Sequence, residues 1–239
     1  MRPLYCRTLA FIGRSGLVRR MNGTDELRLH PECRVLGETY EPEVWAEAMK
    51  CVKTGDAVID VGGHWGLYAV AFGLRVGQSG HVLVAEPDPA NLHLLRANIE
   101  LNCLSQVVEV VPAGMSDESG EGFIVSGSLE SKVRQEGDTS ISLRKIDEVC
   151  GERVYSLMMI DVEGFEEKVL RGARVLLSDE KRRPRMMVVE VHPYAWGPPG
   201  TTSESLLKEL SMHGYRVCDL HGEPVAGISR YGHVVATLS

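Results

Sequence analysis

Short runs of apolar residues alternate with segments of helical periodicity along most of this chain. The apolar runs lie at residues 57–61, 81–85, 107–111, 156–160, 186–191 and 233–238. Because they are continuously apolar, they are typical of strands that are buried on both faces of a sheet. Helical patterns lie at residues 43–52, 66–76, 88–102, 163–178 and 203–213. Strands that alternate with helices predict an α/β fold with a doubly wound, mostly parallel sheet.

Two stretches lack this alternation of apolar runs and helical segments. Residues 1–42 are rich in turn formers and predict an N-terminal extension that packs on a main domain of residues 43–239. Residues 114–146 contain five glycines and only weak strand signals, at 122–125 and 140–143. A long irregular insertion beside the edge of a sheet more often has a functional role than none.

The bulk composition narrows the class of protein. The chain has 239 residues, 44% of them hydrophobic, and a formal net charge of −7. This charge disfavours nucleic acid as a partner, because binding to phosphates draws on clustered Lys and Arg. The six cysteines are scattered and no apolar run reaches 18 residues. We therefore expect a cytoplasmic protein with reduced thiols and no membrane span. The sequence carries no signal for an oligomeric state.

The first predicted strand ends at Asp60 and runs into a glycine-rich turn. The turn reads Gly62-Gly63-His64-Trp65-Gly66. Gly62 and Gly63 permit a tight turn and close approach of a ligand, and Gly66 lets the next helix pack on the strand. The turn lacks the G-x-G-x-x-G pattern of dinucleotide sites and follows an acid, so it suits a cationic ligand such as S-adenosylmethionine. The alternative is a glycine-rich turn without a ligand.

The second and third strands supply further candidates at the same edge of the sheet. Glu86 ends the second strand, where an acid can accept both ribose hydroxyls of an adenosine. Its alternative role is a helix N-terminal acid, but Asp88 already suits the N-cap position. After the third strand, Ala113 and Gly114 leave room for a flat adenine, although a plain tight turn explains them equally well.

The fourth and fifth strands end in titratable residues. Asp161 can act as a general base or position a hydroxyl. Its alternative role is purely structural, as the N-cap of the following helix. The alternative role of Glu163 is that of an acid in the first turn of that helix, stabilised by the helix dipole. Glu190 and His192 share one side of the fifth strand, and a histidine is a natural proton acceptor. A divalent ion held by Asp161, Glu163 and Glu190 is a further alternative, but we expect no metal.

These motifs together resemble the FkbM family of methyltransferases. The residues that carry the resemblance are Val58 to Gly66, Ala85-Glu86-Pro87 with Asn98 and Asn102, and Ile160-Asp161-Val162-Glu163-Gly164-Phe165-Glu166 through Ala173. Tyr40 to Glu43 and Glu190-Val191-His192 also fit that pattern. The resemblance spans roughly residues 37–195 and is most specific in the segment from Ile160 to Glu166.

The resemblance implies a Rossmann-like class I methyltransferase fold, with a seven-stranded sheet whose last strand is antiparallel. It implies S-adenosyl-L-methionine as methyl donor and a small-molecule or sugar hydroxyl as acceptor. The implied cofactor pocket comprises Glu41, Asp60, Gly62, Gly63, His64, Trp65, Gly66, Glu86, Pro87, Ala113, Gly114 and Asp161. The implied acceptor side comprises Asp161, Glu163 and His192. Where the family has Ala-Asn, this chain has Gly63-His64, a change that can reshape the methionine end of the pocket.

The predicted reaction is methyl transfer to a hydroxyl oxygen. In this hypothesis, either Asp161 or His192 removes the hydroxyl proton, and the other orients it. Two other classes of protein are weighed against it. A nicotinamide-dependent oxidoreductase requires the three-glycine loop that this chain lacks. A non-catalytic S-adenosylmethionine-binding module would keep the fold, but acids retained at four strand ends argue against it.

Overall fold

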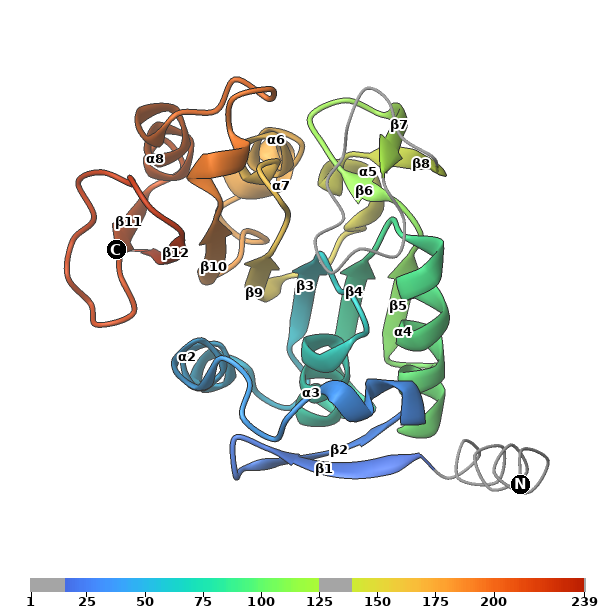
Figure 1. Ribbon diagram of the computed structural model, residues 1–239. Coiled ribbons are helices and arrows are strands. Elements are labelled where there is room, and N and C mark those ends of the chain that lie inside the picture. The colour runs from blue at the N-terminus through green and yellow to red at the C-terminus, as the bar shows by residue number, and fades with distance from the viewer. Residues whose placement is uncertain (1–15, 125–138, 239) are drawn as a thin grey trace.

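The computed structural model describes residues 16–124 and 139–238 (Figure 1). Within these residues, seven strands form one sheet in the order β11-β12-β10-β9-β3-β4-β5. The strands are β3 (Ala57–Val61), β4 (His81–Ala85), β5 (Val108–Val111), β9 (Tyr155–Ile160), β10 (Met186–Val191), β11 (Tyr215–Cys218) and β12 (Gly232–Leu238). Strand β12 is antiparallel to both of its neighbours, while β5, β4, β3, β9 and β10 run parallel. The seven-stranded sheet and its antiparallel last strand are confirmed.

Strand β11 is absent from the predicted set. Its four residues, Tyr215–Cys218, include an exposed arginine, and they form the edge of the sheet. An edge strand is buried on fewer sides than a central one, so its sequence carries a weaker apolar signal.

The helices cover both faces of the sheet. Alternate strand residues, such as Val58 and Ile59, enter two separate apolar cores. One core contains side chains of α2, α3 and α4, and the other those of α6, α7 and α8. The helices are α2 (Pro42–Cys51), α3 (Leu67–Val76), α4 (Pro89–Leu101), α5 (Ile146–Val149), α6 (Glu166–Arg171), α7 (Arg174–Ser178) and α8 (Ser203–Ser211).

The single helix predicted over residues 163–178 is wrong. The chain instead forms two short helices, α6 and α7, with a break at Gly172. A Cβ atom at position 172 would lie 2.0 Å from the carbonyl oxygen of Ser116. The close approach of the segment after β5 therefore explains the glycine, and periodicity along the helix cannot reveal such a contact.

The segment before α2 is tied to α4. Strands β1 (Leu17–Met21) and β2 (Asp25–Leu29) form a hairpin, followed by the short 3₁₀ helix η1 (Pro31–Val35). The Asn102 side chain accepts a hydrogen bond from the backbone N–H of Arg28 and donates one to the backbone carbonyl of Arg28. Asn98 Oδ1 accepts the backbone N–H of His30. These two asparagines, which belong to the family-like motif, thus fix the N-terminal segment to the sheet domain.

The stretch after β5 builds a small second sheet. Strands β6 (Gly114–Met115), β8 (Thr139–Arg144) and β7 (Gly120–Ile124) pair in that order. The weak strand signals at 122–125 and 140–143 are confirmed for their described residues, whereas 125–138 lie outside them. In the described part of the chain, no helix has both the length and the apolarity that crossing a bilayer demands.

Candidate active site

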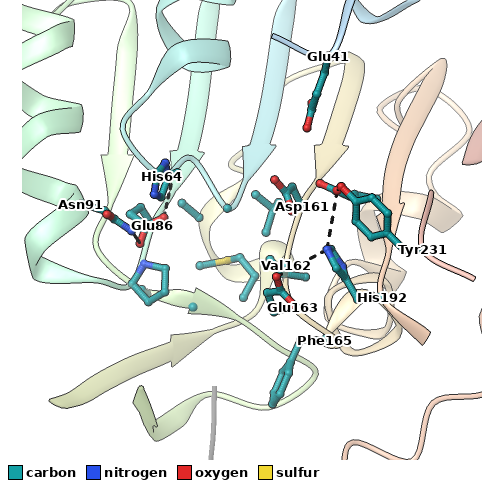
Figure 2. A pocket seen from close by; sticks show the side chains of 18 of the residues that line it. Glu41, His64, Glu86, Asn91, Asp161, Val162, Glu163, Phe165, His192 and Tyr231 are labelled. Atoms are coloured by element: carbon teal, nitrogen blue, oxygen red, sulfur yellow. Dashed lines mark hydrogen bonds and ion pairs between the residues drawn. The ribbon is translucent and has the colours of Figure 1, made fainter. Parts of the chain in front are cut away.

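A cavity of about 400 Å³ opens at the carboxyl ends of the parallel strands (Figure 2). Most of the predicted site residues line it, namely Glu41, Gly62, His64, Glu86, Pro87, Ala113, Gly114, Asp161, Glu163 and His192. A smaller cavity of about 30 Å³ lies beside it and is lined by Asp60, Gly63 and Trp65. Gly62, His64 and Asp161 line both cavities. The fold therefore brings strand ends that are far apart in sequence around one space.

The glycines of the turn are explained by neighbouring protein atoms. A Cβ at Gly62 would lie 1.8 Å from the Asp161 carbonyl oxygen, and one at Gly63 would lie 2.2 Å from Val84 Cγ2. At Gly66 it would lie 2.5 Å from Leu95 Cδ1. Leu95 belongs to α4, so this glycine makes room for α4; at a φ of +83° it is also the N-cap of α3, the helix that follows it.

We expect Gly62→Ala to destabilise the fold by at least about 2 kcal/mol. Gly62 has a φ of +93°, which an L-residue rarely adopts, and the added methyl group would strike the backbone of Asp161. The unfolding midpoint should fall by roughly 4–8 °C in a thermal melt. Gly120→Ala is the control, because its Cβ would meet open space. Equal midpoints for the two variants would contradict this explanation.

His64 is held by its backbone and its neighbour. The residue has a φ of +46°, and its N–H donates to Glu86 Oε2 at 2.8 Å. Its ring stacks on Trp65, with centroids 4.8 Å apart. The Trp65 indole N–H in turn donates to Asn91 Oδ1. The bulky pair therefore links the glycine turn to the start of α4.

Glu86 is fixed in the wall of the cavity. Its carboxylate accepts the backbone N–H groups of His64 and Asp88 and the side-chain amide of Asn91. Asp88 caps α4 by accepting the N–H of Ala90, so the predicted N-cap is confirmed. Burial raises the pKa of Glu86 despite its three donors. The carboxylate is thus a rigid group at the edge of the cavity (Figure 2).

Asp60 is buried with incomplete hydrogen bonding. Its side chain is 3% exposed, and Oδ2 has no hydrogen-bond partner among the described residues. Burial, and secondarily the charge of Glu86, raise the pKa of Asp60 to about 7. A buried carboxylate oxygen without a donor is costly. Its position in the smaller cavity suits a cationic group of a ligand.

Asp161 stands at the other end of the larger cavity. It is not a helix N-cap, because that position of α6 is occupied by Phe165. The Asp161 and Glu190 carboxylates lie within 4.8 Å of each other and of a His192 ring nitrogen. Burial, followed by the charge of Glu190 and a hydrogen bond to it, raises the pKa of Asp161 well above its ordinary value.

His192 is oriented by a buried acid that the sequence did not single out. Glu166 is fully buried, and its Oε1 lies 2.7 Å from His192 Nδ1. The same carboxylate accepts the backbone N–H of His192 and the indole N–H of Trp196. A carboxylate only accepts, so Nδ1 carries a proton, and in the neutral ring Nε2 is the acceptor. Nε2 lies 3.8 Å from Glu163 Oε1.

The environment of His192 also affects its charge. Burial opposes protonation of the ring, but the hydrogen bond to Glu166 and the charges of Glu163 and Glu190 outweigh it and raise the pKa of His192. The only signal for Glu166 in the sequence was its place at the end of the family-like motif.

Two tyrosines that the sequence did not predict lie beside Glu163 and Glu190. Tyr194 donates to Glu163 Oε2 at 2.8 Å, and Tyr231 donates to Glu190. Both line the cavity and are more than half exposed, so they lie at its mouth. Tyr231 is in the loop before β12, where no local sequence pattern singles it out.

The sheet order, with an antiparallel strand between β10 and β11, defines a class I methyltransferase fold. The chain belongs to the FkbM methyltransferase family, because the model of the methyltransferase FkbM domain matches residues 57–217. S-adenosyl-L-methionine is the expected cofactor of this fold. No curated protein is significantly similar to the chain.

Solved structures are similar to this chain at low sequence identity. A methyltransferase FkbM from Methylobacillus flagellatus KT is 17% identical, with a TM-score of 0.51 over 80% of this chain and 50% of that chain. A SAM-dependent O-methyltransferase from Thermotoga maritima is 16% identical, with a TM-score of 0.49 over 83% of this chain and 65% of that chain. The chain thus spans half to just under two thirds of the length of these proteins.

Proposed function

We propose that this protein transfers a methyl group from S-adenosyl-L-methionine to a hydroxyl oxygen of a small molecule or sugar. The observation that supports the proposal is the pair of His192 and Glu166 at the cavity: the Glu166 carboxylate accepts from Nδ1, so Nε2 is the nitrogen of the neutral ring that can take a proton. A hydroxyl is a poor nucleophile until it loses its proton, whereas a neutral amine is not. A histidine that is oriented to accept a proton therefore favours O-methylation over N-methylation.

The residues of the donor end fit S-adenosylmethionine. Asp60 has a buried oxygen without a partner, which suits the ammonium group of the methionine part. Glu86 would accept the ribose hydroxyls, and Pro87, Ala113 and Gly114, which line the same cavity, would lie against the adenine. The bound cofactor supplies a methyl group activated by a sulfonium.

The acceptor end performs the proton transfer. His192 Nε2 takes the proton of the acceptor hydroxyl, and Glu166 stabilises the imidazolium that forms. Asp161, paired with Glu190, orients the acceptor oxygen. Holding the reacting oxygen in line with the methyl group contributes a large part of such a rate enhancement.

Calorimetric titration tests the donor. We expect S-adenosylmethionine and S-adenosylhomocysteine to bind and NAD not to bind, because the turn lacks the dinucleotide loop. Binding of NAD alone would contradict the proposal and favour an oxidoreductase. Activity is then measured with a radiolabelled methyl donor against matched hydroxyl and amine acceptors. Cofactor binding with no turnover on any acceptor would favour a non-catalytic module, and methylation of amines alone would contradict O-methylation.

A further inference from the structure

We propose that Glu41, Glu190 and His233 bind one divalent transition-metal cation beside the acceptor end of the cavity. One ligand atom of each residue lies within 4.8 Å of the others. The three residues come from the start of α2, from β10 and from β12. The proposal replaces the metal-free site expected from the sequence, and cation binding by these residues does not depend on the proposed methyl transfer.

His233 supplies the observation that points to a ligand. It pairs across the strands with Glu190, and its Nε2 lies 3.8 Å from Glu190 Oε1. The side chain is 10% exposed, yet Nε2 is buried with no hydrogen-bond partner among the described residues. A buried ring nitrogen without a partner is costly, and imidazole is the commonest metal ligand in proteins.

Hydrogen bonds orient both carboxylates. The Tyr68 hydroxyl donates to Glu41 Oε2 at 3.0 Å, and the Tyr231 hydroxyl donates to Glu190 Oε1. Glu41 itself adopts a φ of +40°, a conformation that costs energy for any residue other than glycine. Such outer contacts on ligating carboxylates are typical of metal sites.

A second buried histidine shows why the arrangement around His233 is distinctive. His213 also has a buried Nε2 without a hydrogen bond, 3.8 Å from a Glu209 oxygen. Glu209, however, is already neutralised by two 2.7 Å bonds from Arg174. Glu190 instead faces further acids, Glu41 and Asp161, and a cation would offset their repulsion.

The choice of ligands and metal follows from the donor atoms. Asp161, Glu190 and His192 form a neighbouring group of similar size, but His192 Nε2 is the proton acceptor proposed for the hydroxyl. Two carboxylates and one imidazole suit Mn²⁺ or Zn²⁺ better than Ca²⁺ or Mg²⁺, which prefer all-oxygen ligands. A cation here would lie next to the acceptor end without replacing His192.

The test uses Mn²⁺ binding by the full chain after treatment with EDTA and desalting. Free Mn²⁺ is followed by electron paramagnetic resonance during a titration. We expect one Mn²⁺ per chain, and at least about tenfold weaker binding by Glu41→Gln and His233→Ala. His213→Ala is the matched control and should bind as the wild type does. If His233→Ala does not fold, Glu41→Gln alone decides.

Two results would overturn the cation site. They are absence of Mn²⁺ binding by the wild type, and equal affinity of Glu41→Gln, His233→Ala and His213→Ala. A calorimetric titration of the wild type with S-adenosylmethionine in EDTA reports separately on the methyl donor. Donor binding without Mn²⁺ binding would leave the proposed function intact and refute the cation site, and the reverse result would refute only the donor.

Discussion

Replacing His192 with alanine is expected to lower kcat for methyl transfer by about 10²- to 10⁴-fold, the usual value of a general base. In the proposed mechanism Nε2 takes the hydroxyl proton, and its position depends on the bond from Nδ1 to Glu166. Initial rates at saturating donor and acceptor measure the effect. Added imidazole should restore part of the rate to His192→Ala, because the lost group is a diffusible base.

Three further variants separate this role from a structural one. Glu166→Gln keeps an acceptor for Nδ1–H and should lower kcat less than Glu166→Ala, with KM for the acceptor little changed in both. Asp161→Asn keeps the shape of a residue assigned to orientation and should retain a rate within about tenfold of the wild type. A near-normal rate of His192→Ala would refute the assignment of the proton acceptor to His192, and a loss by Asp161→Asn as large as that expected of His192→Ala would assign it to Asp161 instead.

Asp60→Asn is expected to weaken S-adenosylmethionine binding by about 10- to 100-fold at pH 8, the range of one charge-assisted hydrogen bond. Asp60 must be ionised to bind an ammonium group, and burial raises its pKa to about 7. Wild-type affinity should therefore rise as the pH increases from 6 to about 7, where Asp60 ionises, and fall again above about pH 8, where the amino group of the ligand loses its proton. Calorimetry across this range measures it.

The Asp60→Asn variant also isolates the source of the pH dependence. His64 and Glu86 line the same cavities and remain in the variant, so any pH dependence that disappears belongs to Asp60. Equal affinity of the wild type and Asp60→Asn at pH 8 would show that Asp60 does not bind the donor.

In the absence of the methyl donor, Asp60→Asn is expected to stabilise the fold, although it weakens binding of the donor. The pKa of Asp60 rises from 3.8 to about 7 on folding, so the folded chain keeps this proton to a higher pH than the unfolded chain. The stability of the fold that this proton contributes is fully present below pH 3.8. It is lost as the pH rises to about 7. Asp60→Asn should therefore unfold several degrees higher than the wild type at pH 8.

The sequence by itself determined the elements whose signals are local. Continuous apolar runs located six of the seven strands of the central sheet, since burial on both faces makes most positions of a strand apolar. Asp88 and Pro89 marked the start of α4. The acids Asp60, Glu86 and Asp161 were found because parallel strands expose their carboxyl ends at one edge.

Only the tertiary structure decided how those residues are partnered. The break at Gly172 comes from a contact with Ser116 across 56 residues, and Gly66 makes room for Leu95 of another helix. Glu166 holds His192 across 26 residues, and Glu190 meets His233 through the pairing of two strands. Periodicity records which face of an element is buried, but not which side chain from a distant segment lies against it. That pairing depends on the register and packing of the whole sheet.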